Sequence, residues 1–173
     1  ILTSPLGMGR VEATAATSAA IHRFQPRYVL LIGIAGGTGD TVSLGDVLVA
    51  DQFIDYELQK KTDHGSQIRY QAYRADPRLL IAAQHLRDWQ QTVLTTRLDT
   101  GLPRRHIGPI ASGDKVIATR DGSQAYLNDW PKLIGLEMEA GGVASAAFQA
   151  ANKPGVLMIR GVSDLADLNK NSI

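Results

Sequence analysis

The sequence predicts an α/β fold, a three-layer sandwich in which helices flank a central, mostly parallel mixed sheet. Three observations lead to this prediction. Apolar, strand-like runs alternate with helical patterns along the 173 residues, residues 133–162 form a clear strand–helix–strand unit, and 44% of the residues are hydrophobic. The chain has no linker, repeat or low-complexity tract, so we expect a single domain.

The N-terminal part is predicted to contain one helix and two strands. Residues 11–24 are rich in small residues with apolar positions at helical spacing, which indicates a helix packed closely on a sheet. Residues 28–35 are a continuous apolar run closed by Gly36 and Gly37, a pattern typical of a strand buried on both faces. Residues 44–57 begin at a Gly-Asp turn and continue as a predicted strand.

The middle of the chain is less regular. Residues 58–75 are polar and show no pattern, so we expect a solvated loop there. Residues 76–90 are predicted to be helical, because Asp76 can cap the first turn, Pro77 suits that turn, and apolar residues recur at helical spacing.

The C-terminal part returns to alternating strands and helices. We expect a strand over residues 106–114 and a short strand followed by a helical segment over residues 115–130. A strand over residues 133–139, a helix over 140–152 and a strand over 155–162 are expected to follow. This alternation is the pattern of a largely parallel sheet covered by helices.

Composition and charge exclude several classes of protein. Lys and Arg number 18 against 17 Asp and Glu, and the net charge of +1 gives no reason to expect a nucleic-acid or membrane partner. The absence of cysteine excludes disulfides, thiolate metal sites and a cysteine nucleophile. No apolar run approaches the roughly twenty residues of a membrane span, and the first residues lack a signal-peptide layout, so we expect a cytoplasmic location.

The histidines give no sign of a metal site. They lie far apart, without the spacing of known metal motifs, and each is expected on the solvated surface: His22, His64, His85 and His106. Neither a metal nor another cofactor is therefore expected.

Unusual residues gather where the predicted strands end. In an open α/β sheet, ligands bind beyond the carboxyl ends of the strands. Four such ends carry glycines, a serine or acidic residues, and we expect them to meet at one edge: residues 33–37, 112–114, 137–139 and 163–164.

The glycine-rich stretches do not match nucleotide motifs. Gly36 and Gly37 are equally compatible with a tight turn and with a close approach of the backbone to a ligand. They lack the Lys-Ser/Thr of a P-loop, and residues 7–9 lack the third glycine of a dinucleotide-binding motif. We therefore reject both motifs.

The carboxylates at these strand ends carry more information. Glu137 and Glu139 would share one face of a continuing strand, and a glutamate can accept hydrogen bonds from two vicinal hydroxyls. Asp164, at the end of an apolar strand, suits a general acid. Each carboxylate taken alone is better explained as a helix cap or as an ion-pair partner of Arg160 or Lys115, whereas together they favour a ligand site.

Four segments then resemble a known family. GIAGGTGDTVSLGDVLVAD, IASGDKVIA, GLEMEAGGVASAA and IRGVSDLAD, in this order and spacing, resemble the nucleoside phosphorylase and nucleosidase superfamily, above all its methylthioadenosine/S-adenosylhomocysteine nucleosidase branch. The resemblance implies the family fold, with residues 1–173 as one domain that lacks the family's N-terminal strands and long C-terminal helix. It also implies a purine nucleoside as the substrate and a homodimer or larger homo-oligomer.

The resemblance implies roles on the sugar side of the site. Glu139 is similar to the family's ribose-hydroxyl ligand, Met138 to the residue against the sugar, and Glu137 also fits the substrate-binding pattern. The strand end formed by Ile34, Ala35 and Gly36 is expected to line the pocket.

On the base side, Asp164 is similar to the acid that engages purine N7, and Ser163 to the residue that helps to orient it. Val116 and Ile117 are similar to the stretch whose backbone meets the edge of the base. Protonation at N7 stabilises the purine as it leaves the sugar, so these residues predict cleavage of an N-glycosidic bond.

The resemblance leaves the nucleophile and the catalytic status open. Family phosphorylases bind phosphate through an Arg and a Ser at the positions of Leu31 and Ile34, so attack by water is favoured here. Arg10 could still bind phosphate, which keeps a phosphorylase as an alternative. The family's water-activating Glu would precede residue 1, and Glu12 does not match it, so a non-catalytic nucleoside-binding regulatory module is a third possibility.

Overall fold

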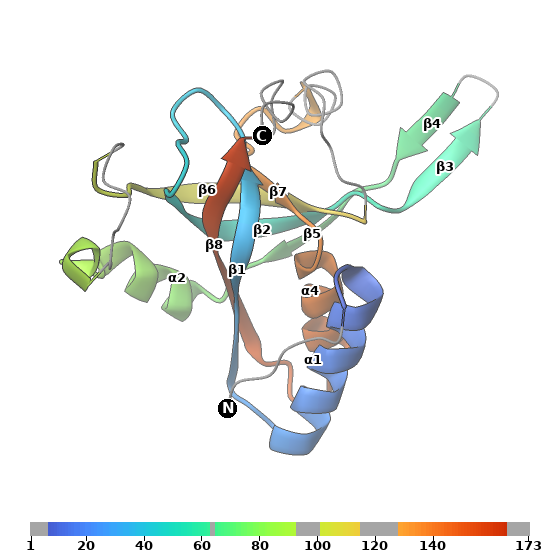
Figure 1. The fold of residues 1–173 in the computed structure, drawn as a ribbon. Coiled ribbons are helices and arrows are strands. Elements are labelled where there is room, and N and C mark those ends of the chain that lie inside the picture. The colour runs from blue at the N-terminus through green and yellow to red at the C-terminus, as the bar shows by residue number, and fades with distance from the viewer. Residues whose placement is uncertain (1–6, 63–64, 93–100, 115–127, 166–173) are drawn as a thin grey trace.

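The computed structural model describes residues 7–62, 65–92, 101–114 and 128–165, shown in colour in Figure 1. Its helices are α1 (Arg10–Phe24), α2 (Pro77–His85), the 3-10 turn η1 (Trp89–Thr92) and α4 (Ala140–Gln149). Its strands are β1 (Tyr28–Gly37), β2 (Val47–Asp55), β3 (Gln59–Thr62), β4 (Gly65–Ile68), β5 (Gln71–Arg74), β6 (Arg105–Ser112), β7 (Gly135–Glu137) and β8 (Gly155–Leu165). The predicted α/β fold with a central mixed sheet is confirmed.

The main sheet has the strand order β5-β2-β6-β7-β1-β8, and β8 also pairs with β2. This extra pairing closes five of the strands into a barrel, which is visible at the centre of Figure 1. The long pairings, β1 with β8 and β2 with β6, are parallel, whereas the pairings of β2 with β5, β1 with β7 and β2 with β8 are short and antiparallel.

Helices cover the barrel on different sides (Figure 1). Helix α1 packs along α4, and α4 contacts β2 and β8. The two helices approach closely at Gly142, where a Cβ atom would lie 2.3 Å from the carbonyl oxygen of Arg10. Helix α2 packs on β8 and β2 and is capped, as predicted, by the Asp76 carboxylate, which accepts hydrogen bonds from the N–H groups of Arg78 and Leu79.

The core consists largely of side chains from the barrel strands. Leu48 and Phe53 on β2, Ile110 on β6 and Met158 on β8 are at most 1% exposed, and each stabilises the fold by roughly 1.5–3 kcal/mol through burial. Because these strands are fixed at their centres, their ends have defined positions. No helix in the described ranges is long and apolar enough to cross a membrane.

The prediction of a loop over residues 58–75 is wrong. The structure forms an antiparallel hairpin there from β3 and β4, followed by β5, which pairs with β2 at the edge of the main sheet. The hairpin extends away from the barrel in Figure 1 and forms a separate two-stranded sheet. The sequences of β3 and β4 are mostly polar and show no alternation of apolar and polar residues, so the pattern by which strands are recognised gave no signal for this pair.

The prediction that β1 is buried on both faces is also wrong. Leu30, Ile32 and Ile34 alternate along the strand and are 55%, 64% and 68% exposed. Between them, Leu31 packs against the core and Gly33 is half-buried. A continuous apolar run therefore identified the strand but could not show how many of its faces are covered.

His106 was expected in solvent, and this prediction is wrong because its side chain is only 16% exposed. Its Nε2 lies 2.7 Å from Oδ2 of Asp46. The same oxygen accepts a hydrogen bond from the backbone N–H of Ser43, and Oδ1 accepts one from the backbone N–H of Arg104. Burial raises the pKa of Asp46, but these N–H groups and His106 together lower it below its ordinary value. The carboxylate thus ties the starts of β2 and β6 together.

Candidate active site

The ends of four strands meet, as the sequence predicts. Gly36 at the end of β1 pairs with Asp164 of β8 on one side and with Leu136 of β7 on the other. Ser112, the last residue of β6, pairs with Glu137, the last residue of β7. Four segments that are far apart in sequence therefore form one edge of the barrel, as Figure 1 shows for β1, β7 and β8.

A row of buried polar residues crosses this edge and anchors two helices. Asp55, Ser112 and Glu137 end β2, β6 and β7 in register and are 3%, 0% and 6% exposed. Asp55 pairs with Arg10 at the start of α1, and Ser112 Oγ accepts a hydrogen bond from the N–H of Gly141 in α4 at 2.8 Å. Ser112 and Glu137 thus satisfy N–H groups that the start of α4 leaves without an intrahelical partner, and Asp55 holds α1 through the Arg10 side chain.

Glu137 caps α4. Its carboxylate accepts hydrogen bonds from the backbone N–H of Ala140 at 3.0 and 3.1 Å and from that of Glu139 at 3.0 Å. It also accepts hydrogen bonds from the Ser112 hydroxyl and from Arg160. The expectation that Glu137 and Glu139 share one face of a strand is wrong, because β7 ends at Glu137 and Glu139 is the residue before the first helical turn.

Burial raises the pKa of Glu137 above that of an exposed glutamate. Arg160, the Ser112 hydroxyl and the two N–H groups stabilise the ionised form and offset part of this shift. The helix cap and the ion pair with Arg160, which the sequence left open as alternatives to ligand binding, are thus both present at Glu137.

Arg160 connects the two glutamates. Its side chain is 4% exposed, and its Nη2 contacts Oε2 of Glu137 and lies 3.0 Å from Oε2 of Glu139. The guanidinium reaches them over Gly33, the residue opposite Arg160 on β1. A Cβ atom at Gly33 would lie 1.9 Å from Arg160 Nη1, so glycine is needed there to leave space for the guanidinium.

Glu139 remains accessible. Its side chain is 20% exposed, and only Oε2 contacts Arg160. In the part of the chain that the structure describes, no partner is found for Oε1, so this oxygen is available to a hydroxyl of a ligand. Met138, between the two glutamates, is half-buried.

Asp164 lies at an irregularity of β8. The register of β8 against β1 shifts so that Ala35 pairs with Val162 and Gly36 with Asp164, which makes Ser163 the extra residue of a bulge. The Ser163 hydroxyl lies 3.1 Å from Oδ2 of Asp164 and 3.4 Å from the carbonyl oxygen of Ala35. Bulges re-aim side chains and are common next to active sites, so the bulge sets the direction of Asp164.

The predicted pocket-lining residues of β1 differ in accessibility. The Ile34 side chain is exposed and can touch a ligand, Gly36 is half-buried, and Ala35 is 4% exposed. Val116 and Ile117, predicted to meet the base, lie outside the described residues, as does Lys115.

Arg10 is already paired. Its Nη2 lies 2.7 Å from Oδ2 of Asp55, and its backbone N–H donates to Oδ1 of Asp114 at 2.9 Å. Asp55 is buried and also accepts a hydrogen bond from the N–H of Glu57 at 3.0 Å. An anion at Arg10 would have to compete with this internal carboxylate.

Sequence reasoning missed Asp55, and it placed Gly33 at a strand end without finding its role beside Arg160. The role of Asp55 had no signal, because one aspartate at the end of a strand is common. Gly33 did have a signal, since a glycine inside an apolar strand often marks a close approach by another group, and Arg160 is the one charged residue in the apolar run of residues 155–162.

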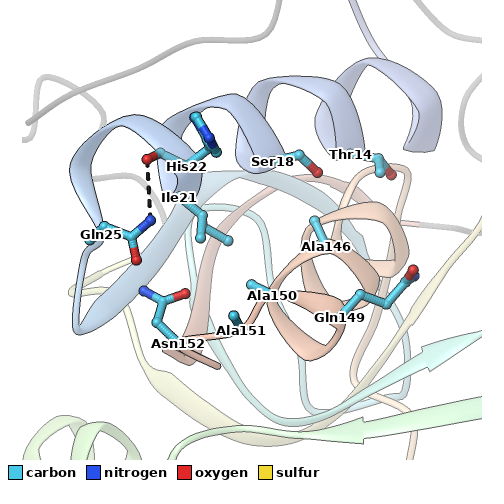
Figure 2. A pocket seen from close by; sticks show the side chains of 10 residues that line it. All are labelled: Thr14, Ser18, Ile21, His22, Gln25, Ala146, Gln149, Ala150, Ala151 and Asn152. Atoms are coloured by element: carbon cyan, nitrogen blue, oxygen red, sulfur yellow. Dashed lines mark hydrogen bonds between the residues drawn. The ribbon is translucent and has the colours of Figure 1, made fainter.

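A separate pocket of about 320 Å³ lies between α1 and α4, and Figure 2 shows its lining. Its lining includes Thr14, Ser18 and His22 of α1 and Ala146 and Gln149 of α4. None of the predicted site residues lines this pocket, so it is distinct from the candidate active site. Among the described residues, no group of three or more His, Asp or Glu could hold a metal ion.

Similar proteins share an enzyme class. The 5'-methylthioadenosine/S-adenosylhomocysteine nucleosidase of Staphylococcus epidermidis is 29% identical over 172 residues, which cover 96% of this chain and 69% of that protein. The enzyme of the same name from Staphylococcus aureus is 29% identical over 167 residues, with the same coverage.

Solved structures show the same fold. A nucleosidase of this kind from Neisseria meningitidis, in complex with methylthio-immucillin-A, superposes with a TM-score of 0.73 at 27% identity, over 94% of this chain and 67% of that one. The nucleosidase of Colwellia psychrerythraea, in complex with adenine, superposes with a TM-score of 0.78 at 26% identity, over 95% of this chain and 65% of that one. The chain thus spans about two thirds of the length of these relatives.

A family model agrees with these similarities and covers nearly the whole chain. The model of the Phosphorylase superfamily matches residues 1–172, which include all four motifs. The resemblance seen in the sequence is therefore confirmed, and this chain belongs to the Phosphorylase superfamily.

Proposed function

We propose that the protein is a nucleosidase that hydrolyses the N-glycosidic bond of an adenine nucleoside of the methylthioadenosine type. The observation that carries this proposal is the pair of acidic groups beside the end of β1, with Glu139 held by Arg160 and Asp164 held by Ser163. The names of the relatives support the reaction, and the adenine and nucleoside analogue in two solved relatives support the ligand class.

On the base side, Asp164 acts as the acid. When the bond between the sugar C1' and the purine N9 breaks, its electron pair moves into the base. Asp164 transfers its proton to N7 and thereby makes the purine a better leaving group. The Ser163 hydroxyl, 3.1 Å from Oδ2, orients the carboxyl group.

On the sugar side, Glu139 holds the ribose. Arg160 fixes Oε2, and Oε1 accepts hydrogen bonds from the ribose hydroxyls. Holding the sugar in this way removes much of the ordering that bond cleavage would otherwise require. The oxygen of a water molecule then bonds to C1', and a base outside the described residues accepts the proton that the water loses, as the family pattern implies.

Two features favour water over phosphate as the nucleophile. Leu31 and Ile34 stand where family phosphorylases carry phosphate ligands, and neither can bind an anion. Arg10, the remaining candidate, is paired with the buried Asp55 at 2.7 Å. A phosphorylase would have to break this ion pair or find another cation.

Identification of the sugar product tests the proposal. The full-length protein is incubated with adenosine, methylthioadenosine, inosine and AMP, with and without phosphate, and base and sugar are separated by chromatography. We expect adenine and a free reducing sugar without phosphate. A sugar 1-phosphate formed only with phosphate would show a phosphorylase, and nucleoside binding without base release would show a regulatory module.

The resemblance also supports two expectations about the protein as a whole. We propose that it works in the cytoplasm and as a homodimer or larger homo-oligomer. Sedimentation at several protein concentrations tests the second expectation, and a concentration-independent monomer would contradict it.

A further inference from the structure

We infer that Glu137 is a positioning residue for the sugar side of the site: it fixes both the backbone and, through Arg160, the carboxylate of Glu139, and does not itself bind substrate. This inference rests on the proposed function and deepens it. It replaces the prediction from sequence that Glu137 is a substrate ligand.

The burial of Glu137 argues against direct contact with a ligand. Its side chain is 1% exposed, whereas that of Glu139 is 20% exposed. Both Glu137 oxygens already accept hydrogen bonds from the protein, from Ala140 and Glu139 N–H groups, the Ser112 hydroxyl and Arg160. A ribose hydroxyl would have to displace one of these donors.

Glu137 reaches Glu139 by two routes. Its Oε2 accepts the backbone N–H of Glu139 at 3.0 Å, which fixes the chain at the start of α4. The same oxygen contacts Arg160 Nη2, which lies 3.0 Å from Oε2 of Glu139. One buried carboxylate thus sets both the position of the Glu139 backbone and the direction of its side chain.

The surroundings of Glu137 restrict Arg160 to this arrangement. Gly33 leaves space for the guanidinium on one side, since any Cβ there would lie 1.9 Å from Nη1. Ser112 is fully buried and fixes Glu137 from the neighbouring strand. Arg160 therefore has a defined position between the two glutamates.

The variant that tests this inference is Glu137→Gln. The glutamine amide has the same shape but only one acceptor oxygen, and its NH₂ group would point at N–H donors or at the guanidinium. Arg160 then loses its buried partner, and Glu139 loses its alignment. Misplacement by about 1 Å can lower activity by about 100-fold, so we expect kcat/KM for methylthioadenosine to fall by roughly 10- to 100-fold.

Discrimination at the ribose separates positioning from simple loss of stability. Dissociation constants and kcat/KM are measured for adenosine and 2'-deoxyadenosine, well below the melting temperature of each variant. If Glu137 positions Glu139, the Glu137→Gln variant prefers adenosine over 2'-deoxyadenosine less strongly than the wild type does. Its preference then approaches that of the Glu139→Gln variant. A purely structural role would lower the amount of folded protein and leave this ratio unchanged.

Asp76 offers a matched control. Like Glu137, its carboxylate caps a helix and pairs with an arginine, Arg78, and its side chain is 8% exposed. It lies at the opposite end of β8, where its N–H donates to Val156, roughly 26 Å along the strand from Asp164. Asp76→Ala is expected to lower the melting temperature and to leave ribose discrimination at its wild-type value.

The outcomes are distinct. Wild-type discrimination in Glu137→Gln would overturn the inference while the proposed function stands. A wild-type protein that neither binds nor cleaves these nucleosides would overturn the proposed function and the inference with it. If Glu137→Gln does not fold, Ser112→Ala is measured instead, because it removes one hydrogen-bond donor to Glu137. A smaller loss of ribose discrimination in the same direction is then expected, and no loss would overturn the inference.

Discussion

Substitution of Gly33 by alanine tests the geometry of the site most sharply. In Gly33→Ala the new methyl group would lie 1.9 Å from Nη1 and 3.1 Å from Cζ of Arg160. A flexible side chain would ordinarily swing away at little cost. Arg160 cannot do so freely, because it is 4% exposed and held by Glu137 and Glu139.

The size of the effect follows from these distances. Ordinary contacts between non-bonded heavy atoms are about 3.5 Å, so the guanidinium must move by roughly 1.5 Å. Such a shift would break its 3.0 Å contact with Glu139 and its contact with Glu137. Loss of a partner from a buried ion pair costs about 3–5 kcal/mol, which corresponds to a fall in melting temperature of roughly 6–20 °C.

Thermal and chemical unfolding of the variant, followed by circular dichroism, measures this loss. Gly161→Ala is the control, since Gly161 lies one residue further along the same parallel pairing and a Cβ there meets nothing within 4 Å. Its alanine variant is expected to be neutral or more stable by about 0.4–1 kcal/mol. If Gly33→Ala unfolds within about 1 kcal/mol of the wild type, Arg160 does not occupy the position described.

Two further predictions concern Glu139 and Asp46. Glu139→Gln is expected to weaken the binding of ribonucleosides, which calorimetry measures. The free energy of unfolding is expected to change by no more than about 1 kcal/mol, because Arg160 keeps Glu137 as a partner. A loss of several kcal/mol would contradict the placement of Glu139 at the accessible side of the site. Asp46→Asn is expected to lower the free energy of unfolding at pH 7 by roughly 1–3 kcal/mol, because the buried carboxylate accepts several hydrogen bonds. Since the folded protein lowers the pKa of Asp46, this contribution is present above about pH 4 and is lost as the pH falls through the folded value. Urea titrations of both proteins between pH 3 and 7 measure it, and a difference that stays constant over this range would contradict the assignment.

The sequence predicted the fold and the meeting of the strand ends because both depend on local patterns. Apolar runs identified β1, β2, β6 and β8, and their glycine, serine and acidic ends lie together in the structure. The hairpin of β3 and β4 could not be found in this way, because its sequence is mostly polar and shows no apolar alternation.

The different roles of Glu137 and Glu139 also could not be read from the sequence. The sequence suggests equivalent neighbours on one strand, but the strand ends between them. Where a strand ends depends on the helix that follows and on long-range partners such as Arg160, which is 23 residues from Glu137. Burial then separates the two carboxylates, leaving one as a helix cap and the other accessible.

Release of adenine from methylthioadenosine in phosphate-free buffer, by the full-length protein beside Asp164→Asn, tests the central claim most directly. We predict release by the wild type and a rate lower by about 10²- to 10⁴-fold in the variant, with the same melting temperature and retained nucleoside binding. Equal rates in the two proteins, or release by the wild type only after phosphate is added, would contradict hydrolysis with Asp164 as the acid.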